Sequence, residues 1–238
     1  MPLPKSTTPV YELELPSTGK KLKYRPFLVK EEKVLILAME SQDMKQITEA
    51  LKNVLSACIL SRGVKVDQLS TFDIEYLFLN VRGKSVGEQI EVVVTCPDDG
   101  ETKVETLIDI DTIKVVTDDK HSRDIDLGGD LKLRMKYPSL QQFVESNFSE
   151  ADLSVDQGFD IIASCIEQVY NEEESWNASD CTKKELVEWV GGLTSAQFKK
   201  VEEFFTTMPK LKHTITVLNP KTSQKNEVVL EGLASFFA

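Results

Sequence analysis

The stretch "VVVTCPDDGETK", Val92–Lys103, brings the most suggestive residue types of the chain close together. Cys96 ends a strand-like run and is followed by a proline, two aspartates and a glycine, as in one half of a zinc ribbon. A structural zinc site needs four thiolate or imidazole ligands, normally supplied as two close pairs. No second cysteine lies near Cys96, and the histidines, His121 and His213, are distant in sequence and are expected at the surface. We therefore predict a structural turn without bound metal, in which Cys96→Ser is nearly silent, formed by Cys96, Pro97, Asp98, Asp99 and Gly100.

Two further patterns resemble catalytic sites. The letters "RGKS", Arg82–Ser85, match the end of a phosphate-binding loop, but the first glycine of that motif would fall on Phe78 in a helix-like segment. Asp109 and Asp111 would share one face of a strand, as an acid pair does, although the solvated face of a hairpin explains them equally. The sequence thus predicts no catalytic residue, no cofactor and no enzyme. An enzyme would need a pocket in which these aspartates or His121 converge with other polar groups.

The composition restricts the class of protein. A chain of 238 residues with 41% hydrophobic content can bury a substantial core. Its apolar runs are far shorter than the roughly 20 residues that cross a bilayer, and the first residues lack the apolar block of a signal peptide. The four cysteines form no C-x-x-C pair, which fits a reducing compartment such as the cytoplasm. The formal charge of −11 argues against a nucleic-acid partner, which requires a basic face.

The acidic residues are unevenly distributed. Within the segment Gln142–Gly192, which we interpret as helical, acidic side chains far outnumber the basic ones, which are Lys183 and Lys184. Such a segment is either a solvated surface or a docking face for a basic partner. Within it we predict the partner-binding residues Glu172, Glu173 and Glu174. The apolar C-terminal residues Phe236 and Phe237 either pack into the chain's own core or bind a partner, and we count them as candidate partner-binding residues.

The order of elements appears twice along the chain. Hairpin patterns with a nearby proline cover Tyr11–Phe27 and Arg123–Leu140. Each is followed by an amphipathic helical pattern, Lys45–Ser61 and then Asp156–Tyr170, whose letters include "SACI" and "ASCI". Two further segments begin with serine or threonine as a helix cap and lead into strand pairs; they cover Leu69–Arg82 and Leu193–Met208.

These matching orders predict an α+β fold with two tandem, similar units, each built as β-hairpin, helices and β-hairpin. We expect an N-terminal tail at residues 1–9, a first unit at 10–116, a linker at 117–122 and a second unit at 123–238. In this division, the linker "TDDKHS" would be the only connection between the units.

Three stretches, "GKKLKYRPFLVKEEKVLILAME", "FDIEYLFLNVRGKSVGEQIEV" and "LEGLASFF", resemble the baseplate hub assembly proteins of T-even-type (T4-like) bacteriophages. Relatives have a fuller C-P-x-C-G tip, which Cys96, Pro97 and Gly100 match and Asp99 does not, so no metal site is carried over.

The resemblance implies a non-enzymatic structural or assembly protein of a contractile tail baseplate, or its hub, that acts through protein–protein surfaces. Its partners would be other baseplate or tail hub proteins, with no nucleic acid and no membrane. The expected location is the host cytoplasm during assembly and, if the chain is retained, the virion tail baseplate. The alternative is a general adaptor or chaperone-like protein for tail assembly that is absent from the finished virion.

Overall fold

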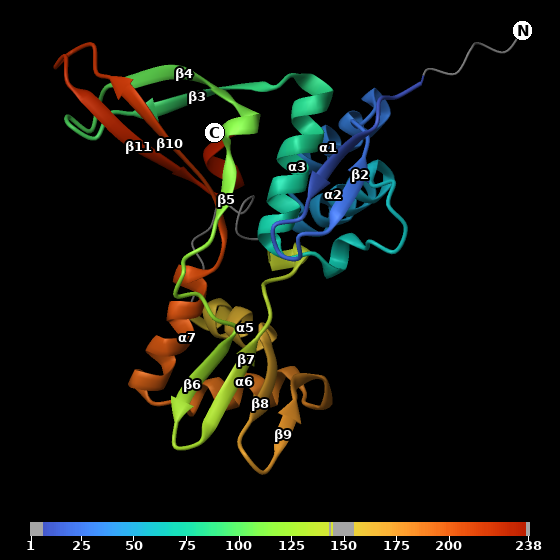
Figure 1. Cartoon of the computed structure of the whole chain (residues 1–238), viewed down its shortest axis with the longest axis vertical. Coiled ribbons are helices and arrows are strands. Elements are labelled where there is room, and N and C mark those ends of the chain that lie inside the picture. The colour runs from blue at the N-terminus through green and yellow to red at the C-terminus, as the bar shows by residue number, and fades with distance from the viewer. Residues whose placement is uncertain (1–6, 143, 145–154, 237–238) are drawn as a thin grey trace, which may run out of the picture.

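The computed structural model describes residues 7–142, 144 and 155–236, and within them the chain is α+β (Figure 1). Its first half contains β1 (Tyr11–Glu14), β2 (Lys21–Tyr24), α1 (Val29–Glu40), α2 (Met44–Cys58), η1 (Val66–Gln68), α3 (Thr71–Val86), β3 (Gln89–Thr95), β4 (Lys103–Asp109), η2 (Ile110–Thr112) and β5 (Lys114–Val116). Its second half contains β6 (Asp124–Gly128), β7 (Leu131–Met135), α5 (Val155–Ser164), β8 (Ile166–Tyr170), β9 (Ser175–Asn177), η3 (Ala178–Asp180), α6 (Lys183–Gly191), α7 (Ser195–Thr207), β10 (Lys210–Leu218), β11 (Lys225–Glu231) and η4 (Leu233–Phe236).

The chain forms two bodies, each with its own hydrophobic core. The first body, in the upper part of Figure 1, combines β1–β5 and α1–α3 with β10, β11 and η4. The second body, in the lower part, consists of β6–β9 and α5–α7. Its core includes Leu133, Val169, Val190, Val201 and Phe204.

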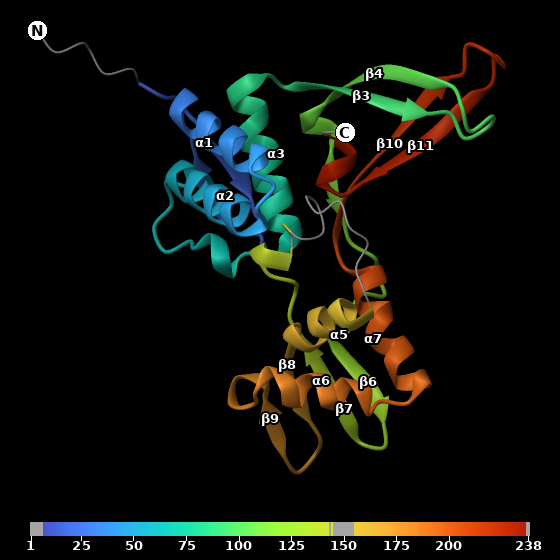
Figure 2. The ribbon, with the colours of Figure 1, turned by 180° about the vertical axis from the view of Figure 1, so that it is seen from behind.

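The residues that make up each core therefore disagree with the expected division of the chain at residues 117–122. Leu211, Val217 and Leu230, from the end of the expected second unit, lie in the first core. The physical reason is that an isolated hairpin leaves its apolar face exposed. Hairpin β10–β11 lies beside hairpin β3–β4 (Figures 1 and 2), so that each covers the apolar face of the other. Strand β10 also pairs with β5 in the sheet β11-β10-β5. The second body is thus inserted between parts of the first.

The two bodies have matching contacts at one place, where a helix ends next to a hairpin strand. In the first body, the backbone N–H of Arg25 donates to the carbonyl of Cys58 (3.0 Å), and Tyr24 forms a bridge with Ile59. In the second, Lys136 donates to Cys165 (2.7 Å), and Met135 pairs with Ile166 in the same way. Cys58 and Cys165 are both fully buried at the C-terminal end of a helix. The similar letters "SACI" and "ASCI" thus occupy equivalent places.

The helical patterns were correct in part. The predicted helix Lys45–Ser61 is confirmed as α2, with its apolar stripe buried and its end at Cys58. The predicted helix Asp156–Tyr170 is wrong beyond Ser164, because Ile166–Tyr170 is strand β8. Ile166 and Val169 are three residues apart, as on a helix face, yet both point into the core because Glu167 is an extra residue at a β-bulge opposite β7.

Candidate functional site

The turn at Cys96–Gly100 is closed by its own polar groups. The N–H of Gly100 donates to the carbonyl of Cys96 (2.9 Å), and Gly100 adopts a φ of 68°, which favours glycine. Asp99 accepts hydrogen bonds from the N–H groups of Glu101 (3.1 Å) and Thr102 (3.0 Å). The Thr102 hydroxyl also donates to Asp99 and holds the pKa of its carboxyl well below the ordinary value. Asp99, which departs from the cysteine pattern, therefore stabilises the turn as a hydrogen-bond acceptor.

The tip of the second hairpin repeats this geometry with other residues. The N–H of Ser223 donates to the carbonyl of Asn219 (2.8 Å), and Ser223 has a φ of 59°. The side-chain oxygen of Asn219 accepts a hydrogen bond from the N–H of Lys221 (2.8 Å). Asn219 is fully buried at the position that corresponds to Cys96. The two tips thus form the same kind of turn, although their letters differ.

Asp98 joins the two tips. The side-chain amide of Asn219 donates to one carboxylate oxygen of Asp98 (2.8 Å), and the hydroxyl of Thr222 donates to the other. The backbone N–H of Asp98 donates to the side-chain oxygen of Asn226 (3.1 Å), and Asn226 is itself buried. The hydrogen bonds from Thr222 and then Asn219 lower the pKa of the Asp98 carboxyl. We call Asp98, Asn219, Thr222 and Asn226 the tip clasp.

The described residues contain no group of three or more His, Cys, Asp and Glu side chains placed to hold a metal ion. Cys96 is fully buried in the first core, and burial raises the pKa of its thiol. A buried, protonated thiol packs as a small apolar group. The geometry is that of a structural turn in which the thiol faces inward.

We expect the protein to purify without stoichiometric zinc, because the residues that the structure describes place no set of four ligands near Cys96. Since Cys96 is fully buried, Cys96→Ser is no longer expected to be nearly silent. It should lower the denaturation midpoint more than Cys96→Ala, because a buried hydroxyl needs a hydrogen-bond partner. Elemental analysis and chemical denaturation check both points. One zinc per chain, lost in Cys96→Ser, would reverse this interpretation.

Glu172, Glu173 and Glu174 lie at the turn between β8 and β9. The interpretation of the whole acidic segment as helical is therefore wrong at these residues. The side-chain oxygen of Asn171 accepts hydrogen bonds from the N–H groups of Glu173 (2.9 Å) and Glu174 (2.6 Å) and fixes this turn. The three side chains are exposed, and none forms an ion pair with another described residue. They are therefore available to a partner.

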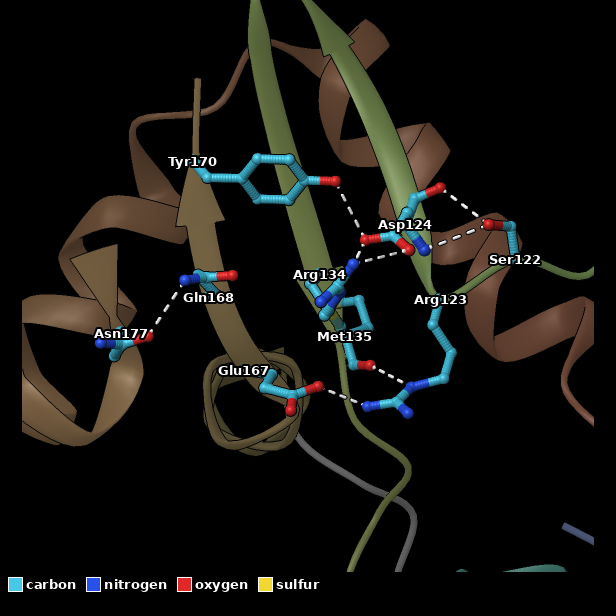
Figure 3. A network of polar contacts seen from close by, with 9 residues as sticks. All are labelled: Ser122, Arg123, Asp124, Arg134, Met135, Glu167, Gln168, Tyr170 and Asn177. Atoms are coloured by element: carbon cyan, nitrogen blue, oxygen red, sulfur yellow. Dashed lines mark hydrogen bonds and ion pairs between the residues drawn. The ribbon is translucent and has the colours of Figure 1, made fainter. Parts of the chain in front are cut away.

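The outer face of the sheet β6-β7-β8-β9 carries charges that pair with one another (Figure 3). The guanidinium of Arg134 donates to the carboxylate of Asp124 (2.8 Å), which also accepts the hydroxyl of Tyr170 (3.0 Å). Arg123 donates to the carbonyl of Met135 (2.8 Å) and pairs with Glu167 at the bulge. These side chains satisfy one another across three strands, so this face stabilises the sheet.

The residues considered for catalysis do not converge. Asp109 ends β4 and accepts a hydrogen bond from Gln89 (3.0 Å), whereas Asp111 lies in the 3-10 turn η2 and not on a strand face. His121, expected at the surface, is half-buried against the ring of Tyr137, whose hydroxyl lies 3.0 Å from its Nε2, and burial lowers its pKa. A cleft of about 930 Å³ lies between the bodies, but none of these three residues lines it. Its lining includes Ser17, Ser70, Arg123, Tyr137, Gln142 and Lys183.

An exposed apolar face on α1 was missed by the sequence interpretation. The side chains of this helix that are between 47% and 82% exposed are Val29, Val34, Ile36, Leu37 and Met39. The signal was the run "VLILAM", in which every position is apolar. One face of a helix takes only residues three or four apart, so such a run leaves apolar side chains on a second face. Exposed apolar patches of this kind mark interaction sites.

Phe236 is fully buried in the first core, where η4 contacts β3 and β11. Phe236 therefore packs into the chain's own core, the first of the two alternatives for the C-terminal aromatic residues. Phe237 lies outside the described residues. The described part of the chain also has no helix that is long and apolar enough to cross a membrane.

Comparisons with known proteins identify a family. The family model described as "T4 bacteriophage base plate protein" matches residues 8–238. No curated protein and no solved structure matches the chain.

Proposed function

Because the chain belongs to the family of T4 bacteriophage base plate proteins, which matches it over residues 8–238, we propose that it is a non-enzymatic structural or assembly protein of the baseplate hub. It acts through protein–protein surfaces, and its partners are other baseplate or tail hub proteins. It meets them in the host cytoplasm during assembly. Nothing in its charge favours a nucleic-acid partner, since the chain carries a net charge of −11.

The observation that carries this proposal is the exposed apolar face of α1, which consists of Val29, Val34, Ile36, Leu37 and Met39. The helix packs against α2 and buries its small residue Ala38, whereas these larger side chains stay in water. A neighbouring baseplate subunit that covers them would gain on the order of 25 cal/mol for each Å² of apolar surface removed from water. In the free chain this apolar surface remains in contact with water.

Two variants test the role of this face. We expect Ile36→Lys with Leu37→Lys to change the free energy of unfolding by less than about 1 kcal/mol, because both side chains are about half exposed. The same variant should fail to support baseplate assembly, because charged side chains there oppose apolar contact. Lys33→Glu, on an exposed position of the same helix, is the control. Tail assembly is scored by electron microscopy, with the variant supplied in place of the phage's own copy. Normal assembly with the double variant would remove α1 from the interface.

The alternative is an adaptor or chaperone-like protein that assists tail assembly and then leaves. Mass spectrometry of purified particles beside infected-cell lysate separates the two. A structural hub component is present in both samples, whereas an assembly factor is present in the lysate alone.

A further inference from the structure

We propose that the apolar groove between α6 and the inner face of the sheet β7-β8-β9 binds a basic protein segment that inserts an apolar side chain. The inference deepens the proposed function, on which it rests for the premise that the chain acts by binding proteins. We call this groove the tryptophan groove; its larger apolar lining residues are Leu131, Ile166, Val169, Trp176, Leu186 and Trp189.

The tryptophan groove has a volume of about 430 Å³ and a mainly apolar lining. It receives both tryptophans of the chain, one from β9 and one from α6. Trp176 pairs across the strands with Val169 and is 45% exposed. Tryptophan is enriched among the few residues that dominate binding energy at interfaces, where it lies in pockets that become dry. A half-exposed tryptophan beside an open apolar groove fits that role.

The charges around the groove select the partner. Glu185 lines the groove, Asp180 lies next to Cys181 on its wall, and Glu172, Glu173 and Glu174 form the adjoining β8–β9 turn. Among the basic side chains of this region, Lys183 pairs with Asp160 and Lys184 with Glu188, and Lys132, which lies near Glu172, is outnumbered by the acidic residues. The net field at the groove is therefore negative and attracts lysine and arginine.

The same charges disfavour other occupants. A second copy of this chain carries a net charge of −11 and would bring its own acidic rim to the groove. An anionic lipid surface would be repelled for the same reason. A basic segment with an aliphatic or aromatic anchor satisfies both the apolar lining and the acidic rim.

The chain provides its own reporters for a test. Its tryptophans both lie in the groove, so intrinsic fluorescence follows occupancy there. Of its cysteines, Cys58, Cys96 and Cys165 are buried and Cys181 is partly exposed on the groove wall, so a thiol reagent should label Cys181 first. The probe is a synthetic amphipathic peptide of leucine and lysine, and its leucine–glutamate counterpart of equal length is the control.

We expect the leucine–lysine peptide to shift the tryptophan emission to shorter wavelength and to slow labelling of Cys181, and the leucine–glutamate peptide to do neither. Trp176→Ala should weaken binding at least tenfold, with Trp189 as the remaining reporter. Replacing Glu172, Glu173 and Glu174 with Lys should lower affinity at low salt by roughly tenfold and flatten its salt dependence. Val229→Ala, an exposed apolar residue of the first body, is the matched control and should bind normally.

Equal affinity of the leucine–lysine peptide for the wild-type chain and for Trp176→Ala would overturn the proposal. So would equal binding of the leucine–glutamate peptide, because the acidic rim would then not select the partner. As a control for folding, the circular dichroism spectra of the variants with exposed substitutions should match that of the wild-type chain. The proposed function is tested separately, by the composition of purified particles and by the α1 variants.

Discussion

Phe236→Ala is expected to reduce the free energy of unfolding of the first body by about 3 to 5 kcal/mol, the usual cost of removing a fully buried phenylalanine side chain. Phe236 belongs to the first core and lies on η4, which contacts a strand of each hairpin, β3 and β11. Its loss would leave a cavity that extended strands cannot easily close. A truncation that removes residues 236–238 should have a similar effect.

Two signals separate this effect from general unfolding. Both tryptophans lie in the second body, so the fluorescence transition reports that body, whereas far-ultraviolet circular dichroism reports both bodies. We expect Phe236→Ala to shift the circular dichroism transition in guanidinium and to leave the fluorescence transition in place. Val229→Ala, 50% exposed on β11, is the control. An unchanged circular dichroism midpoint together with lost partner binding would instead assign Phe236 to an interface.

Asn219→Asp should be the most damaging small change in the tip clasp, with a cost of about 2 to 3 kcal/mol at neutral pH. The substitution keeps the shape of a fully buried side chain but replaces the amide that donates to Asp98 (2.8 Å) with a second carboxylate. Two carboxylates at that distance do not both ionise without strong repulsion. Asn53→Asp, the same chemical change at an exposed position of α2, is the control.

The effect of Asn219→Asp should depend on pH in a definite direction. In the wild-type chain the pKa of Asp98 is lowered, so its stabilising contribution is present above about pH 4 and is lost as the pH falls through that lowered value. In the variant one of the paired carboxyls has a raised pKa, so the damage develops as the pH rises through the raised value. Denaturation midpoints of both chains should therefore differ more at pH 7 than at pH 4. A difference independent of pH would mean that Asn219 acts by packing alone.

Local periodicity was enough to predict much of the fold. The stripe of α2 has the spacing of a helix along its whole length, and Thr194 caps α7 through a reciprocal contact with Gln197, as its place before that helix suggested. Strand β8 was missed because the bulge at Glu167 gives strand residues a helical spacing. The apolar run of α1 carried the information about its exposed face, but only the partner helix α2 decides which side chains stay in water.

The candidate site was predicted only as far as the contacts are local. The turn at Cys96–Gly100 follows from proline, aspartate and glycine at adjacent positions. The clasp between Asp98 and Asn219 joins residues 121 positions apart, so no local pattern contains it. The same applies to the tryptophan groove, because Trp176 and Trp189 meet only when α6 packs on the sheet. Long-range pairing thus decided both the division into bodies and the surfaces that remain exposed.

The insertion of the second body between parts of the first sets an order of events during synthesis. The second core is complete once the ribosome has released residues up to about Phe204, whereas the first still lacks β10, β11 and Phe236. At roughly 5 to 20 residues per second, translation of the remaining strands takes on the order of seconds. During that time the inward faces of β3 and β4, including Val92 and Val94, stay exposed to water beside unpaired strand edges. The nascent chain is therefore most vulnerable to aggregation, and most accessible to chaperones, just before its last hairpin emerges.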